Sequence, residues 1–123
     1  MEIEVSIGEI VDKLSILRIK KNNISEPEKL VNVNKEYDYL YYKVFQELKI
    51  ETSDFHELMM VNEMLWNVED SIRVKEKNKE FDSDFIEMAR SVYITNDQRY
   101  EIKKKINLKY SSNFIEEKSY NKY

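Results

Sequence analysis

The sequence predicts an all-α protein, and three observations lead to this fold class. The chain of 123 residues contains one glycine and one proline, the residues that most often interrupt helices and form turns. Hydrophobic residues recur at spacings of three and four along most of the chain, as on one face of an α-helix. Helix-start signals precede these runs. A chain of this length holds one hydrophobic core, so we expect a single domain over residues 1–123.

The composition excludes several classes of protein. A net charge of −4 argues against general nucleic-acid binding, which needs a basic surface. The chain has no cysteine, so it has no disulfide framework, thiolate metal site or cysteine nucleophile. No apolar run approaches the roughly 20 residues that span a bilayer, and the N-terminus lacks the basic start of a signal peptide. We therefore expect a cytoplasmic protein without a membrane span.

The first helix is predicted to follow a short extended arm, residues 1–5, in which apolar and acidic residues alternate. Ser6 and Glu9 have the spacing of a capping box, which begins a helix that runs to about residue 22. Apolar residues cover two faces of this helix, so we expect it to be buried on more than one side. It is either central in the domain or shared with another subunit, and for this reason we expect a homo-oligomer.

Two long helices are predicted next. Ser25 and Pro27 begin a second helix, whose apolar residues from Leu30 to Leu48 step by three and four to about residue 49. Residues 52–54 offer caps for a third helix, which continues to about residue 79 and carries Trp66, the only tryptophan. We expect these two helices to form a long antiparallel hairpin with the first helix packed along it.

Two shorter helices are predicted to close one end of the domain. Residues 82–84 open a fourth helix, and Thr95 with Gln98 forms a second capping box. This pattern predicts a sharp corner at residues 95–97 and a fifth helix over residues 97–110. Residues 111–123 lose helical periodicity, so we expect a short extended C-terminal arm.

The first candidate site lies on one face of the third helix and consists of Glu63, Trp66, Asp70 and Arg73. Two carboxylates on such a face suit Mg²⁺ and phosphate chemistry. They are about 10 Å apart along the helix, so a second helix would have to supply further ligands. The alternative interpretation is an intrahelical pair of Asp70 with Arg73 beside a half-buried tryptophan.

The second candidate site surrounds the expected corner and consists of Arg90, Tyr93, Asn96, Asp97, Arg99 and Lys103. Guanidinium groups and the free N–H groups of a helix N-terminus bind carboxylate or phosphate, so an anion could be held there. The alternative is structural, with Arg90 bonding carbonyl groups across the corner.

The first helix also carries charged residues, namely Asp12, Lys13 and Arg18. Charges inside an otherwise apolar helix need partners, and we expect them to pair across a subunit interface. The single histidine, His56, has no clustered histidine or cysteine and is interpreted as a surface residue.

Several segments together resemble a small uncharacterised family of helical proteins. They are Val5–Glu9 with Asp12–Lys13, Asn62–Glu63, Leu65–Trp66, Glu69–Asp70 with Arg73, Phe85–Ile86, Ala89–Arg90, Tyr93, Thr95–Asp97 with Arg99, Ile106–Asn107 and Glu117–Lys118. The resemblance implies a short single-domain helical protein of bacteria and some phages, often encoded near genes for cell-surface polysaccharide and glycosyl transfer. It transfers no activity.

Two functions are compatible with these observations. The first is a non-catalytic interaction or accessory module without a cofactor, linked to surface-polysaccharide assembly and contacting a protein partner through the Trp66 face or the Arg90 corner. The second is a small helical enzyme or binder for an anionic substrate such as a nucleotide or sugar phosphate, with Mg²⁺ on Glu63 and Asp70. The sequence has no recognisable nucleophile, metal-ligand cluster or glycine-rich phosphate loop, which favours the first.

Overall fold

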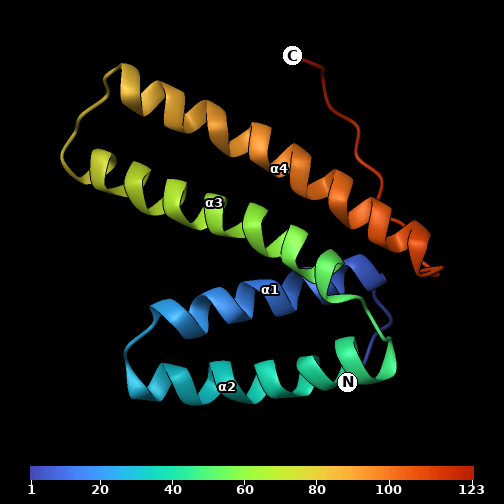
Figure 1. Cartoon of the computed structure of the whole chain (residues 1–123). Coiled ribbons are helices and arrows are strands. Elements are labelled where there is room, and N and C mark those ends of the chain that lie inside the picture. The colour runs from blue at the N-terminus through green and yellow to red at the C-terminus, as the bar shows by residue number, and fades with distance from the viewer.

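The computed structural model describes all residues, 1–123, and contains four α-helices and no strand, as expected for the all-α class (Figure 1). The helices are α1 (Ile7–Asn23), α2 (Pro27–Tyr41), α3 (Thr52–Lys77) and α4 (Ser83–Lys109). A π-helical segment, η1 (Tyr42–Glu47), extends α2. Residues 1–6 and 110–123 lie outside the helices. None of the four helices combines the length and the hydrophobicity needed to cross a bilayer.

Local sequence signals fix the starts of three helices. The hydroxyl of Ser6 accepts a hydrogen bond from the backbone N–H of Glu9 at 3.2 Å, which caps α1. Pro27 occupies the first turn of α2, where its missing N–H costs nothing. The carboxylate of Asp82 accepts from the N–H of Phe85 at 2.9 Å and caps α4. These predicted helix starts are confirmed.

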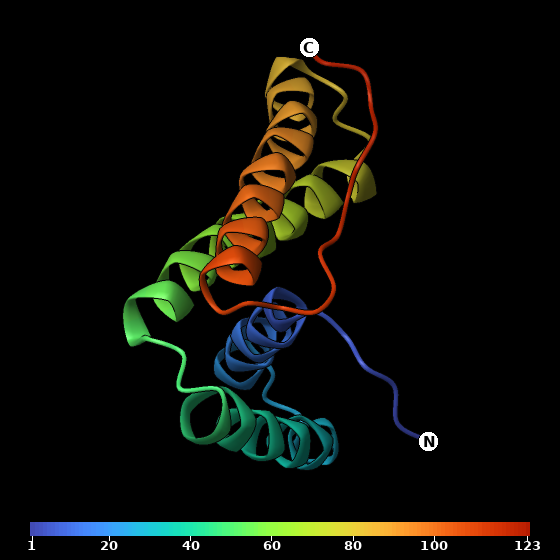
Figure 2. The ribbon, with the colours of Figure 1, turned by 90° about the vertical axis from the view of Figure 1, so that its right-hand side faces the viewer.

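The helices pair differently from the predicted arrangement. α1 packs on α2, and α3 packs on α4, while α2 and α3 make no contact (Figures 1 and 2). The predicted hairpin of the second and third helices is therefore wrong. The inner face of α3 is occupied by α1 and α4, and Lys49, with φ of 53°, turns the chain away from α2 before α3 begins.

The predicted corner at residues 95–97 is also absent, because α4 runs unbroken through it. Thr95 is buried, and Arg99, Lys103 and Asn107 follow it on the inner side of the same helix at steps of four. Arg99, Lys103 and Asn107 find partners on α1, so the helix gains more from continuing than from ending at a local capping box. The two predicted shorter helices are one helix.

The hydrophobic core lies where α1, α2, η1, the start of α3 and the end of α4 meet. Its buried members are Val11, Leu14, Leu17, Tyr37, Val44, Ile50, Phe55, Leu58 and Ile106. Both apolar faces of α1 are covered within the chain, by α2 on one side and by α3 and α4 on the other. No residue between Leu65 and Thr95 is buried, so the second half of α3 and the first half of α4 form an arm beyond the core (Figure 1).

Candidate functional site: a cavity between α1, α3 and α4

The close approach of α1 to α4 depends on Gly8. Its backbone N–H donates to Oδ1 of Asn107 at 2.6 Å, within the buried contact between the two helices. A Cβ atom at this position would lie 2.6 Å from the carbonyl oxygen of Lys103 and 3.0 Å from the Asn107 side chain. Only glycine fits here without a shift of α4.

Asp12 joins three helices through a fully buried carboxylate. Its Oδ1 accepts from Nε of Arg99 at 2.9 Å, and its Oδ2 accepts from Nη2 of the same guanidinium. The amide nitrogen of Asn62 on α3 donates to Oδ1 of Asp12 at 2.9 Å and to the hydroxyl of Ser15 at 2.7 Å. The hydrogen bond to Asp12 raises the pKa of Arg99 above its ordinary value. The predicted partner of Asp12 in another subunit is therefore found within the same chain.

Lys103 lies one turn beyond Arg99 on α4 and extends this polar contact. Its Nζ lies 2.8 Å from Oε2 of Glu9 and 3.9 Å from Oε2 of Glu116, and its side chain is 9% exposed. Lys103 was predicted to bind an anion, but the structure gives it two carboxylates of this chain as partners. Lys103 lines a separate hollow of about 220 Å³, whose lining also includes Asn96 and Arg99.

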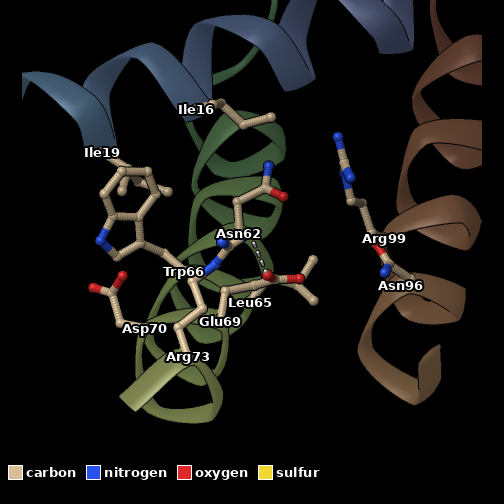
Figure 3. A pocket seen from close by; sticks show the side chains of 10 residues that line it. All are labelled: Ile16, Ile19, Asn62, Leu65, Trp66, Glu69, Asp70, Arg73, Asn96 and Arg99. Carbon is tan, nitrogen blue, oxygen red and sulfur yellow. Dashed lines mark ion pairs between the residues drawn. The ribbon is translucent and has the colours of Figure 1, made fainter. Parts of the chain in front are cut away.

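An open cavity of about 440 Å³ lies beside the Asp12 contact, between α1, α3 and α4 (Figure 3). It is lined by Ile16, Ile19, Asn62, Leu65, Trp66, Glu69, Asp70, Arg73, Asn96 and Arg99. Figure 3 shows the indole of Trp66 next to Ile19, while Asn96 and Arg99 reach in from α4 on the other side. One wall is therefore apolar and aromatic, and the rest is polar. Small-molecule sites commonly have this composition.

The polar atoms of the cavity are partly held in place and partly free. The Asn62 amide nitrogen is engaged by Asp12 and Ser15, which leaves its Oδ1 without a protein donor. Arg99 uses Nε and Nη2 on Asp12, which leaves Nη1 without a protein acceptor. The cavity thus presents an acceptor and a donor whose orientations are fixed by buried partners.

The charges of the cavity do not favour an anion. Arg73 lies 3.7 Å from Glu69, a different partner from the Asp70 that the sequence predicted. Arg99 is paired with Asp12, and Asp70 has no ion-pair partner. The lining therefore balances two arginines with two carboxylates, and the buried Asp12 engages Arg99 from behind. A lining without net positive charge suits an uncharged polar ligand better than a phosphate.

The structure brings together part of the predicted set. Trp66, Asp70, Arg73, Asn96 and Arg99 line the cavity. The remaining predicted residues, Glu63, Arg90, Tyr93, Asp97 and Lys103, do not line it. Glu63 is exposed elsewhere on α3, Arg90 pairs with Glu87 at 3.0 Å, and the ring of Tyr93 packs on that of Tyr123. No three His, Cys, Asp or Glu side chains come close enough to hold a metal ion.

Part of the cavity lining was not assigned to a site from the sequence. Asn62 and Glu69 belong with Trp66 and Arg73 at spacings of four, three and four, so the same helical periodicity that found Trp66 would have found them. Ile16 and Ile19 also line the cavity, and they belong to the apolar residues of the first helix for which the sequence predicted only burial. No local pattern in the sequence indicated that Asp12 meets Arg99, which is 87 residues away.

Comparison with known proteins gives a family but no annotated relative. The whole chain, residues 1–123, matches a model described as a family of unknown function, DUF6165. No curated protein and no solved structure matches the chain.

Proposed function

This chain belongs to the family of unknown function DUF6165, and we propose that it is a non-catalytic interaction module whose contact site is the cavity between α1, α3 and α4. The observation that supports this most is the convergence of Trp66, Asp70, Arg73, Asn96 and Arg99 from two helices on one open hollow. Residues so far apart in the sequence share a cavity only because the fold holds α4 against α1 and α3.

The lining supports an uncharged ligand rich in hydroxyl groups, such as a sugar unit of a polysaccharide. The half-buried indole of Trp66 offers a flat apolar surface on which the less polar face of a sugar ring can stack. Asn62 Oδ1 and Arg99 Nη1 supply an acceptor and a donor, and the amide of Asn96 supplies both. Asp70 adds a carboxylate that accepts from hydroxyl groups. This chemistry agrees with a role in surface-polysaccharide assembly.

Two features support a binding role over the enzymatic alternative. Catalysis on a nucleotide or sugar phosphate with Mg²⁺ would need acids from a second helix beside Glu63 and Asp70, and no such cluster forms. The lining of the cavity also carries no net positive charge that would favour a phosphate group. Arg73 and Arg99 are engaged by carboxylates of the chain, which agrees with a role in positioning the cavity wall.

The single tryptophan makes this proposal directly testable. Trp66 is the only indole in the chain and lines the cavity, so its fluorescence reports occupancy without a label. Titration with N-acetylglucosamine, galactose and their short oligomers should change its emission saturably. A response to nucleotides or sugar nucleotides that requires Mg²⁺ would support the enzymatic alternative instead, and no response to either group would overturn the proposal.

A matched pair of variants separates the cavity from the rest of α3. Asp70 lines the cavity, whereas Glu63 is an exposed acid on the same helix that does not. Asp70→Asn should weaken sugar binding severalfold because it removes a charged acceptor. Glu63→Gln should leave binding unchanged. Equal effects of both substitutions would contradict the placement of the site.

A further inference from the structure

A second hollow adjoins the cavity at Arg99 and is here called the Lys103 hollow. Its volume is about 220 Å³, and it is lined by Glu9 on α1, by four residues of α4, and by Glu116 and Lys118 on the C-terminal arm. Tyr100 is its one hydrophobic lining residue. Small-molecule sites usually measure ~300–1,000 Å³. The Lys103 hollow is therefore better suited to extend a neighbouring site than to hold a ligand alone.

The contact of Arg99 with Asp12 forms the boundary between the two hollows. Arg99 and Asn96, which reach in from α4 in Figure 3, line both of them. On α1, Ile16 lies about one turn after Asp12 and lines the cavity, whereas Glu9 lies about one turn before it and lines the Lys103 hollow. The Arg99 side chain crosses between these turns and stays 28% exposed. A ligand can therefore pass over it from one hollow into the other.

Lys103 gives its hollow a buried donor that is only partly satisfied. The side chain is 9% exposed, and Nζ donates to Oε2 of Glu9 at 2.8 Å. Oε2 of Glu116, at 3.9 Å, lies beyond hydrogen-bonding distance. An ammonium group carries three N–H donors, so two are left for water or a ligand. Unmet donors inside a protein cost free energy, which a ligand oxygen would recover.

The other groups of the Lys103 hollow place acceptors beside donors. The carboxylates of Glu9 and Glu116 accept, and the ammonium group of Lys118, which forms no ion pair, donates. Sugar hydroxyl groups match this arrangement because each of them donates and accepts. The three cations of the lining are balanced by these two carboxylates and by Asp12 behind Arg99. The hollow therefore has no net charge that would select an anion.

The Lys103 hollow has no aromatic surface on which a sugar ring could stack. Tyr100 is buried, its hydroxyl donates to the carbonyl of Glu116 at 3.2 Å, and Nζ of Lys118 lies 5.4 Å from the centre of its ring. Trp66 in the cavity is therefore the stacking surface for both hollows. A sugar unit in the Lys103 hollow would be held by hydrogen bonds and by its linkage to a unit at Trp66.

We propose that the Lys103 hollow is a second sugar subsite and that the ligand is an uncharged oligosaccharide of at least two units. One unit stacks on Trp66, and the next unit lies beyond Arg99, where its hydroxyl groups bind to Lys103, Glu116 and Lys118. This inference rests on the proposed function of the cavity. It adds that a single sugar fills only part of the site.

Titrations of the Trp66 fluorescence with sugars of one and two units test the length of the ligand. The probes are N-acetylglucosamine and galactose, each as the monomer and as the β-1,4-linked dimer. For the sugar that responds, the dimer should bind about tenfold more tightly than the monomer, the effect of one or two added hydrogen bonds. Equal affinities would overturn the second subsite and leave the site in the cavity intact. No response to any of these sugars would overturn the proposed function as well.

Matched substitutions on the C-terminal arm test where the second unit lies. Glu116 and Lys118 line the Lys103 hollow, whereas Glu117 and Lys122 do not, and all of these residues are exposed. Glu116→Gln and Lys118→Ala should each reduce the advantage of the dimer over the monomer severalfold. Glu117→Gln and Lys122→Ala should preserve this advantage. An advantage that survives in both lining variants, or that falls equally in the two controls, would refute the second subsite.

Discussion

Removal of the Asp12 carboxylate is the perturbation that most directly probes how the cavity is held. Asp12→Ala leaves the guanidinium of Arg99, which is 28% exposed, without its partner, and it takes one of two acceptors from the Asn62 amide. Breaking a buried ion pair on one side costs about 3–5 kcal/mol. Because Arg99 retains some access to water, we expect the free energy of unfolding to fall by about 2–4 kcal/mol. This corresponds to a Tm lower by about 8–16 °C.

Urea unfolding followed by circular dichroism measures this loss as a shift in midpoint at constant slope. Asp12→Asn keeps the shape and the acceptor oxygen and should lose less. Asp38→Ala removes an exposed carboxylate on α2 that forms no ion pair, and should change the free energy of unfolding by less than about 0.5 kcal/mol. If Asp12→Ala destabilised the protein no more than Asp38→Ala, the Asp12 contact would not hold α1, α3 and α4 together and the reasoning would be refuted.

Three further predictions follow from other contacts. Gly8→Ala should lower the free energy of unfolding by about 1–3 kcal/mol, because the added Cβ would lie 2.6 Å from the Lys103 carbonyl oxygen; an unchanged urea midpoint would contradict the close approach. Burial raises the pKa of Asp54, but hydrogen bonds, chiefly from Lys109, outweigh it and hold the pKa below its ordinary value. The folded pKa thus lies below the unfolded one, so this stabilisation is complete above about pH 4 and is lost as the pH falls through the folded value. Asp54→Asn should therefore flatten the acid side of a plot of Tm against pH, and an equally steep acid side would count against the Lys109 contact. Arg90→Ala removes an exposed ion pair on α4 and should change the free energy of unfolding by less than about 0.5 kcal/mol. The sugar response of Trp66 should stay intact, and its loss would show that Arg90 belongs to the binding site.

The helical class and most helix boundaries followed from local signals, since the scarcity of glycine and proline and the caps at Ser6, Pro27 and Asp82 act within a single turn. The pairing of helices did not follow, because it depends on which faces meet across long sequence separations. α4 was divided at Thr95 because Thr95 and Gln98 have the spacing of a capping box, a local signal that the continuous helix overrides. The partners of Arg99, Lys103 and Asn107 on α1 became visible only in the fold.

For the candidate site, too, the sequence allowed only residues on one helix face to be grouped correctly. Trp66, Asp70 and Arg73 could be grouped because one helix places them on one face. Asn96 and Arg99 were found for a different reason, a corner that does not exist, and they reach the cavity because α4 is straight. The contact of Asp12 with Arg99, which positions the cavity wall, joins two residues that no local pattern connects.

The most direct measurement of the central claim is the ¹H–¹⁵N cross-peak of the Trp66 indole, which is the only tryptophan indole signal of the chain. Addition of a neutral oligosaccharide should move this peak together with the side-chain amide peaks of Asn62 and Asn96, while the amide peaks of Asn32 on the exposed side of α2 stay in place. An indole peak that does not move at saturating sugar, in a protein whose remaining spectrum indicates the folded state, would contradict the assignment of this cavity as the binding site.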